Sequence, residues 1–107
     1  MPVYNKLVRD LIPDIITAQG KKCVFETLEP DAYHGELRKK LQEELQEYLS
    51  AATDQEASEE LADLLEVIYA LAAVHGVTEQ ELSKLRSSKR DKRGGFEKRI
   101  LLIEADK

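Results

Sequence analysis

The sequence has little that could cross-link the chain or anchor it. It contains one cysteine, Cys23, and no tryptophan, three prolines and two histidines among 107 residues. A single cysteine excludes an internal disulfide and a thiolate zinc site built from this chain alone. There is no run of about 18 apolar residues and no charged-then-apolar leader. We therefore expect neither a membrane span nor a signal peptide, and we expect the protein to be cytoplasmic.

A basic excess is also absent. The 16 lysines and arginines are outnumbered by 21 acidic residues, and the formal net charge is −5. A protein that coats nucleic acid needs a basic face, so this balance argues against a nucleic-acid polymer as partner. Charged residues nevertheless make up 35% of the chain and aromatic residues only 6%. This composition favours long helices with charged faces, in one small domain that spans 1–107.

Capping residues and glycines divide the chain into expected helices. Thr53 and Thr78 each stand three residues before a glutamate, which is the capping-box pattern of a helix N-terminus. Asp10 is a candidate cap for the first helix, and Gly20 and Gly76 are candidate stops. The expected helices are 10–18, 31–52, 53–75 and 78–92.

Two segments outside these helices are rich in residues that favour strands. Residues 22–28 include Val24 and Phe25, and residues 99–103 include four consecutive apolar side chains. The second segment is either a strand beside the first or a short packed helix. We therefore expect an all-α fold, a helical bundle, with short strands as candidates near 22–28 and 99–103.

The helix expected over 53–75 is apolar on more than one face. At about 100° per residue, its large apolar side chains cover roughly 200° of the circumference. A chain of this size buries a limited core by itself, so we expect a homo-oligomer, either a dimer or a tetramer. Glu60 falls inside the apolar arc and Asp63 lies at its edge. A carboxylate buried there must be protonated, paired or bound to a metal.

Each of the two central helices carries an acidic i, i+3 pair beside its apolar stripe. Glu44 and Glu47 form the first pair, and Glu60 and Asp63 form the second. A tight turn between the helices places all four carboxylates near one point. Such oxygen ligands suit Mg²⁺, with Mn²⁺ as the alternative, and these ions recruit phosphates. Either pair alone is typical of a solvated helix face, but two pairs on consecutive helices indicate a metal site.

Cations gather at two places in the chain. Residues 88–96 carry four lysines and arginines before a Gly-Gly pair, and residues 5–10 carry Lys6 and Arg9. Arginine binds phosphate through two hydrogen bonds, lysine supplies a point charge, and glycine lets the backbone come close. Cations at a helix C-terminus also complement the helix dipole, which is the alternative for 88–96. Beside a metal site, phosphate binding is the better interpretation.

Two motifs resemble a known superfamily. Residues 43–47, EELQE, followed by 60–63, ELAD, are similar to the EExxE…ExxD signature of the all-α nucleoside triphosphate pyrophosphohydrolases. That superfamily includes MazG, dimeric dUTPases and phosphoribosyl-ATP pyrophosphohydrolase. Residues 4–10 and 89–96 resemble the ends of its short, single-domain MazG-like members.

The resemblance implies a Mg²⁺-dependent enzyme that cleaves a nucleotide between its α- and β-phosphates. The products would be a nucleoside monophosphate and pyrophosphate, and the role would be the removal of non-standard or excess nucleotides. Hydrolysis of phosphoribosyl-ATP in histidine biosynthesis is the alternative within the superfamily. A non-catalytic helical dimerisation or nucleotide-binding module is the alternative from a different class.

The resemblance also implies roles for particular residues. The four paired carboxylates match metal ligands, and Glu43 matches the adjacent glutamate of the signature, whose particular role stays open. Lys89 and Arg93 match the phosphate-facing cations of the superfamily, and Lys6 and Arg9 are two further candidates. Four tyrosines are available for stacking on a base, although core and surface positions are the more usual roles of tyrosine. The expected site residues are Glu43, Glu44, Glu47, Glu60 and Asp63 for catalysis, the last four of these for the metal, and Lys6, Arg9, Lys89 and Arg93 for phosphate.

Overall fold

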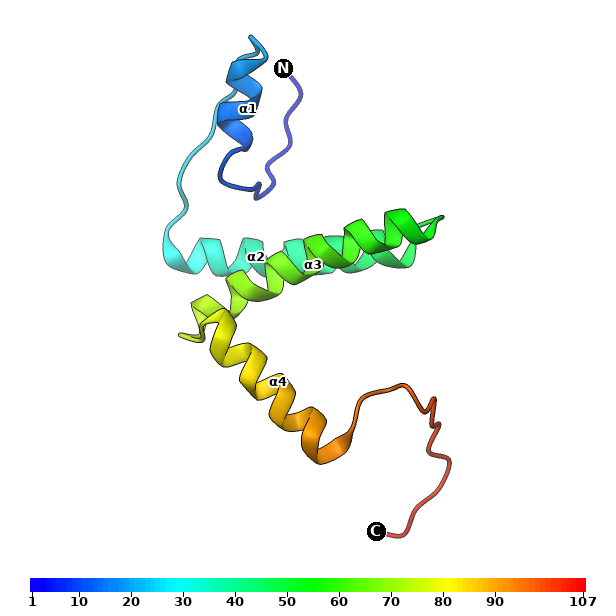
Figure 1. Ribbon diagram of the computed structural model, residues 1–107. Coiled ribbons are helices and arrows are strands. Elements are labelled where there is room, and N and C mark those ends of the chain that lie inside the picture. Colours follow the sequence, from blue (N-terminus) through cyan, green and yellow to red (C-terminus); the bar gives the residue numbers. More distant parts are fainter.

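The chain folds into helices in the order in which the capping residues predict them. The computed structural model describes residues 1–107 and contains four α-helices. The expected all-α fold is therefore confirmed, and the helix ends differ from the predicted ones by up to three residues. The helices are α1 (Ile12–Ala18), α2 (Pro30–Leu49), α3 (Asp54–Val74) and α4 (Glu79–Arg93) (Figure 1).

Threonine caps begin α3 and α4 as predicted. Thr53 Oγ1 accepts a hydrogen bond from the backbone amide of Glu56 at 3.1 Å, and the Glu56 carboxylate accepts one from the amide of Ala52 at 3.0 Å. Thr78 Oγ1 accepts a hydrogen bond from the amide of Glu81 at 3.1 Å. These bonds satisfy amides that have no partner inside the helix, and so they set where each helix starts.

The start of α1 differs from the prediction. Asp10 does not cap this helix, because Leu11 is the capping residue and no side chain bonds to the helix end. Pro13 lies in the first turn, where its missing N–H leaves one donor fewer to be capped. Gly20 follows the helix at φ +77°, so its role as a stop is confirmed.

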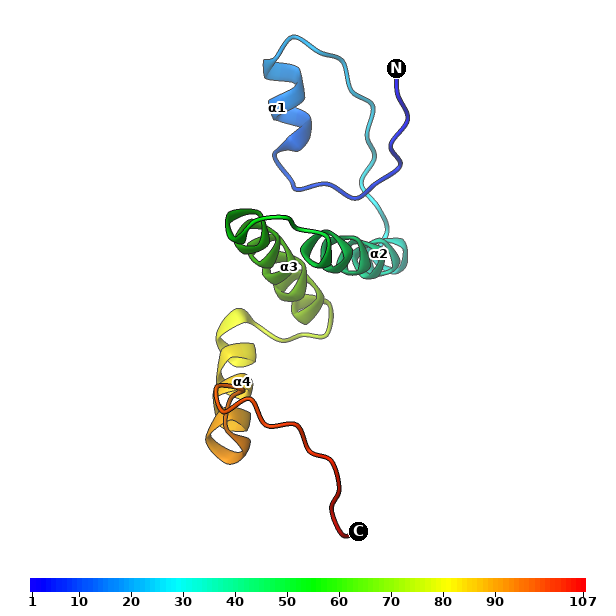
Figure 2. The ribbon, with the colours of Figure 1, turned by 90° about the vertical axis from the view of Figure 1, so that its right-hand side faces the viewer.

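The antiparallel hairpin of α2 and α3 contains the core of the molecule. Its buried residues are Leu37 and Glu44 from α2, and Val67 and Ala72 from α3. Figures 1 and 2 show this hairpin between α1 on one side and α4 on the other. α1 packs against no other helix, and α4 touches only α3. No single helix is long and apolar enough to cross a membrane, and only α3 and α4 together, across a bend of 104°, reach that length and composition.

The strands expected near 22–28 and 99–103 are absent, so this part of the prediction is wrong. A strand needs a neighbour with which to exchange backbone hydrogen bonds. Residues 22–28 run from α1 to α2, whereas 99–103 follow α4 at the other end of the molecule, where they form no helix either (Figure 1). Because the two segments lie far apart, neither provides an edge for the other. Their large apolar side chains stay exposed, except that of Leu28, which is half-buried.

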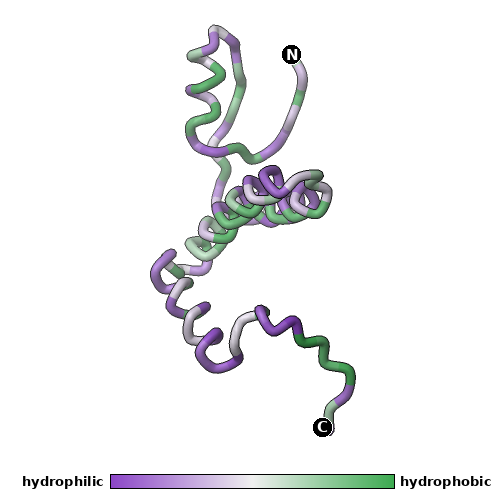
Figure 3. The backbone as a smooth tube through the Cα atoms, turned by 45° about the vertical axis from the view of Figure 1, so that its right-hand side comes forward, coloured by the Kyte–Doolittle hydropathy of each residue, from purple (hydrophilic) through white to green (hydrophobic).

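The molecule is extended for its length. Its radius of gyration is 18.2 Å, whereas a compact chain of this length has one of about 13 Å. In Figure 3 apolar and hydrophilic residues alternate along the hairpin, and a continuous apolar stretch lies just before the C-terminus. Four leucines of the hairpin are between 45% and 66% exposed, namely Leu45, Leu49, Leu61 and Leu65.

Candidate active site

Three glutamates meet where α2 and α3 lie side by side. Glu44 and Glu47 stand one turn apart on α2, and Glu60 comes from the first half of α3. The short turn at 50–53 makes the helices antiparallel, so residues just before it approach those just after it. One carboxylate oxygen from each glutamate lies within 4.8 Å of the other two. We call these three residues the glutamate cluster.

The glutamate cluster is partly removed from water. Glu44 is only 6% exposed, and burial, followed by the nearby Glu47, raises its pKa. Desolvation and the neighbouring Glu47 and Glu44 raise the pKa of Glu60 to about 7. Both shifts have the same origin, because negative charges held close together away from water disfavour the ionised form.

The residues of the glutamate cluster fit a hard divalent cation. All of its donors are carboxylate oxygens, which Mg²⁺ and Mn²⁺ prefer over zinc or copper. Two buried oxygens, Glu44 Oε2 and Glu60 Oε2, have no hydrogen-bond partner. A buried polar atom without a partner is costly, and a cation between these helices would satisfy both oxygens and offset the repulsion.

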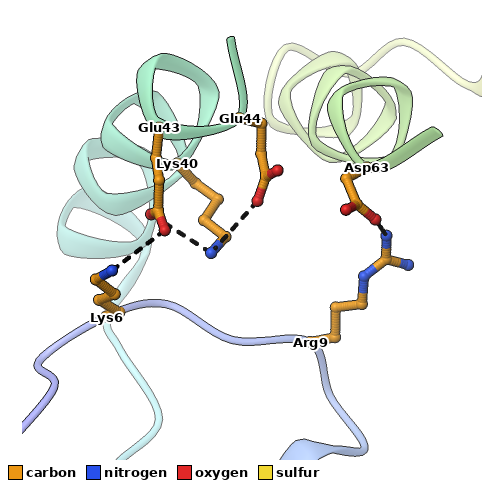
Figure 4. A network of polar contacts seen from close by, with 6 residues as sticks. All are labelled: Lys6, Arg9, Lys40, Glu43, Glu44 and Asp63. Atoms are coloured by element: carbon orange, nitrogen blue, oxygen red, sulfur yellow. Dashed lines mark hydrogen bonds and ion pairs between the residues drawn. The ribbon is translucent and has the colours of Figure 1, made fainter. Parts of the chain in front are cut away.

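Asp63 lies outside the glutamate cluster, although its i, i+3 spacing from Glu60 grouped it with the others. Arg9 Nη2 donates a hydrogen bond to Asp63 Oδ1 at 2.7 Å (Figure 4). Arg9 Nη1 also lies 3.7 Å from Glu66 Oε1. The structure therefore joins two of the predicted site residues, Arg9 and Asp63, as an ion pair. It does so by passing the N-terminal segment across one side of the hairpin.

Glu43 is held by two lysines on the same side of the hairpin. Lys6 Nζ lies 3.3 Å from Glu43 Oε1, and Lys40 Nζ lies 3.4 Å from Glu43 Oε2 (Figure 4). Burial acts to raise the pKa of Glu43, but the two lysines together outweigh it and lower that pKa below its usual value. The pKa of Glu43 is thus shifted in the opposite direction to the pKa values of Glu44 and Glu60.

Lys89 and Arg93 are not brought to the glutamates within this chain. Both belong to α4, whose C-terminal end points away from the hairpin (Figures 1 and 2). Both are exposed. Arg90, on the same helix, pairs instead with Glu97 at 2.6 Å, just beyond Gly94 and its φ of +81°. Three basic residues lie in the last turn of α4, where they complement the helix dipole. This agrees with the alternative interpretation of residues 88–96.

The sequence reasoning missed Lys40. Its Nζ lies 3.6 Å from Glu44 Oε1 and also pairs with Glu43, so it connects the two consecutive glutamates (Figure 4). The signal was present, because Lys40 stands three and four residues before them on one helix face. No pattern in the sequence indicated a contact between the two histidines. His34 and His75 lie edge to face, with ring centroids 5.5 Å apart.

An antiparallel helical hairpin that gathers carboxylates from both helices defines a class of all-α proteins with a candidate metal centre. Within that class, residues 24–87 match the phosphoribosyl-ATP pyrophosphohydrolase family, and the chain belongs to this family. Both acidic pairs lie inside the matched range, whereas Lys6, Arg9, Lys89 and Arg93 lie outside it. The family is named for a pyrophosphohydrolase, which agrees with the resemblance seen in the sequence.

One curated relative is similar over part of its length. It is an uncharacterized protein of Mycolicibacterium smegmatis, 44% identical over 54 residues. The aligned region covers 50% of this chain and 55% of the relative, so the chain spans about half the length of the curated relative that it matches. No solved structure matches the chain significantly.

Proposed function

We propose that this protein is a Mg²⁺-dependent nucleoside triphosphate pyrophosphohydrolase that releases a nucleoside monophosphate and pyrophosphate. The observation that carries the proposal is the glutamate cluster, in which three carboxylates from two helices lie within 4.8 Å and two buried oxygens have no partner. Membership of a pyrophosphohydrolase family supports the same chemistry. Its role would be to remove non-standard or excess nucleotides in the cytoplasm.

In this proposal the glutamate cluster holds the metal, with Asp63 as a fourth ligand once Arg9 has left it. When bound there, Mg²⁺ would neutralise charge on the phosphates and help to activate a water for attack. The chain supplies the other functions. Arg9 and Lys6 bind phosphate oxygens, and a carboxylate oxygen that the metal leaves free accepts the proton of the attacking water.

Lys89 and Arg93 would bind phosphate only in an assembly in which α4 of one chain lies beside the glutamate cluster of another. A homo-oligomer, a dimer or a tetramer, would provide one. The exposed leucines of the hairpin and the extended shape of the single chain support such an assembly.

The test is a panel of nucleoside triphosphates incubated with the full chain and Mg²⁺. We expect pyrophosphate and the matching monophosphate to appear together, and EDTA to abolish both. Glu60→Gln removes a charge from the glutamate cluster and should lose Mg²⁺ binding and activity while the fold is kept. Glu59→Gln, the exposed neighbour on the same helix, is the matched control and should behave as wild type. Absence of pyrophosphate release across the panel, with Mg²⁺ binding intact, would contradict the proposal.

The family match itself favours a second candidate, the hydrolysis of phosphoribosyl-ATP. The bond cleaved and the metal centre would be the same, so the two candidates differ only in the nucleoside part of the substrate. Complementation of a strain that lacks this step of histidine biosynthesis separates them. Growth without histidine would support the second candidate.

A further inference from the structure

A pocket lies beside the glutamate cluster, between the N-terminal segment and the α2–α3 hairpin. Its volume is about 340 Å³, which falls within the range of small-molecule sites, roughly 300–1,000 Å³. Glu44 and Asp63 both line it, so the pocket opens directly onto candidate metal ligands. A ligand in this pocket would therefore extend to the metal centre.

The two helices give this pocket an apolar wall. Tyr33 and Leu37 come from α2, one turn apart, and Val67 and Ala70 come from α3, also one turn apart. Leu37 and Val67 are buried, so the core of the hairpin fixes the wall. Tyr33 remains 36% exposed, which leaves part of its ring free for contact. An aromatic ring beside aliphatic side chains is a surface on which a nucleobase stacks.

The same pocket contains two cations from different parts of the chain. Arg9 lies on the N-terminal segment and pairs with Asp63, while Lys40 lies on α2 and pairs with Glu43 and Glu44 (Figure 4). Asp63 and Glu44 are candidate metal ligands, so a metal that bound them would release Arg9 from Asp63 and Lys40 from Glu44, while Lys40 would keep its pair with Glu43. The lining also includes four carboxylates, namely Asp10, Glu44, Asp63 and Glu66, so the two cations can serve a phosphate once a metal ion offsets part of that negative charge. With the metal in place, the pocket would offer a nucleotide an apolar wall and two cations.

We propose that this pocket binds the nucleoside monophosphate part of the substrate, with the base on Tyr33 and the phosphate between Arg9 and Lys40. The inference rests on the proposed function, and it states where the nucleoside monophosphate part of the substrate binds within that same site. Four tyrosines were available for stacking, and of these only Tyr33 lines the pocket. Arg9 lies outside the range matched to the family, so the N-terminal segment adds a wall that the matched range does not contain.

The experiment measures binding without requiring turnover. The full chain in Mg²⁺ is titrated by calorimetry with a nucleoside monophosphate and, separately, with inorganic pyrophosphate. We expect Tyr33→Leu to weaken binding of the monophosphate about fivefold to tenfold and to leave binding of pyrophosphate unchanged, because stacking acts on the base alone. Tyr33→Phe keeps the ring and should bind the monophosphate as wild type does.

Tyr48→Leu is the matched control, because Tyr48 lies on the same helix, is 37% exposed and does not line the pocket. It should leave the affinity for the monophosphate unchanged. In steady-state assays, Tyr33→Leu should raise KM by the same factor as it weakens binding, with kcat nearly unaltered.

The inference is overturned if Tyr33→Leu binds the monophosphate as tightly as wild type, or if wild type does not bind it at all. Different results would contradict the inference and the proposed function. A wild-type protein that binds the monophosphate through Tyr33 but releases no pyrophosphate would reject the enzyme and support the pocket. An active wild type with an unaltered Tyr33→Leu variant would do the reverse.

Discussion

Glu60 lies close to two other carboxylates, those of Glu44 and Glu47. Desolvation and the two neighbouring glutamates raise its pKa to about 7 from the usual 4.5, and the pKa of Glu44 is raised as well. Between pH 4.5 and about 7 the folded chain therefore binds more protons than the unfolded chain does. Because the unfolded state binds fewer protons in this window, the free energy of unfolding of the metal-free protein falls as the pH rises through it.

We expect the metal-free wild-type protein to unfold at a lower urea concentration at about pH 8 than at about pH 5.5. Glu60→Gln places a neutral group in the glutamate cluster, so it should flatten this pH dependence and unfold at a higher urea concentration than wild type at the higher pH. The measurement is urea unfolding in EDTA at both pH values. Glu59→Gln should keep the wild-type slope, and equal slopes for wild type and Glu60→Gln would contradict the explanation.

Arg9 pairs with Asp63, which the proposed function makes a fourth metal ligand. The pair is exposed, with Asp63 41% accessible, so removing it should change the free energy of unfolding by less than about 1 kcal/mol. Arg9→Gln leaves Asp63 free and should raise the affinity for Mg²⁺ about two- to fivefold in low salt, and less in high salt.

Calorimetric titration of the metal-free protein with Mg²⁺ tests this competition. Lys6→Gln is the control, because Lys6 pairs with Glu43, which lies outside the glutamate cluster. We expect its Mg²⁺ affinity to stay close to that of wild type. An Arg9→Gln variant with unchanged Mg²⁺ affinity would remove Asp63 from the set of metal ligands.

At the scale of the elements, the junction between α3 and α4 depends on one glycine. Gly76 has φ +76°, and no atom lies within 4 Å of the position that a Cβ would take. Alanine there is opposed by backbone strain alone, so Gly76→Ala should lower the free energy of unfolding by about 1–2 kcal/mol. Gly35, inside α2, has equally open surroundings and no such φ, so Gly35→Ala should raise it by about 0.5–1 kcal/mol.

Urea denaturation of the two glycine variants is the measurement. The prediction is a difference in sign between identical substitutions, and two changes of the same sign would contradict it. The contrast also shows why the ends of the helices were predictable from sequence. Caps and glycines act through a few neighbouring residues, so Thr53, Thr78 and Gly76 appear where the structure uses them.

At the scale of the whole molecule, the single chain leaves most of its apolar surface uncovered. Only four of its 107 residues are buried. We therefore expect light scattering coupled to gel filtration to give a mass that is a multiple of the 12.2 kDa chain. Leu65→Lys should lower that mass, because it puts a charge on the exposed leucines of the hairpin.

Ala62→Lys is the matched control for this experiment. Ala62 is exposed on the same helix, between Glu59 and Glu66 at helical spacing, where a lysine is compatible with its neighbours. It should leave the mass unchanged. A wild-type protein that elutes at the mass of one chain would contradict the expected assembly.

The candidate site was only partly predictable. The pairing of Glu44 with Glu47 follows from i, i+3 spacing, and their approach to Glu60 follows from a short turn between two helices. The engagement of Asp63 by Arg9 did not follow, because 54 residues separate them and only the path of the N-terminal segment joins them. The strands at 22–28 and 99–103 failed for the same reason, since β-propensity says nothing of whether a partner lies alongside.

By itself, the sequence determined the four helices, the two acidic pairs and the family to which the chain belongs. These depend on capping, helical spacing and residue identity, which act over short stretches of chain. Only the tertiary structure decided which carboxylates share a centre, which cations reach them, and that Tyr33 alone among four tyrosines borders the pocket beside them. Distances between side chains on different elements depend on how those elements pack, and no local pattern in the sequence specifies that packing.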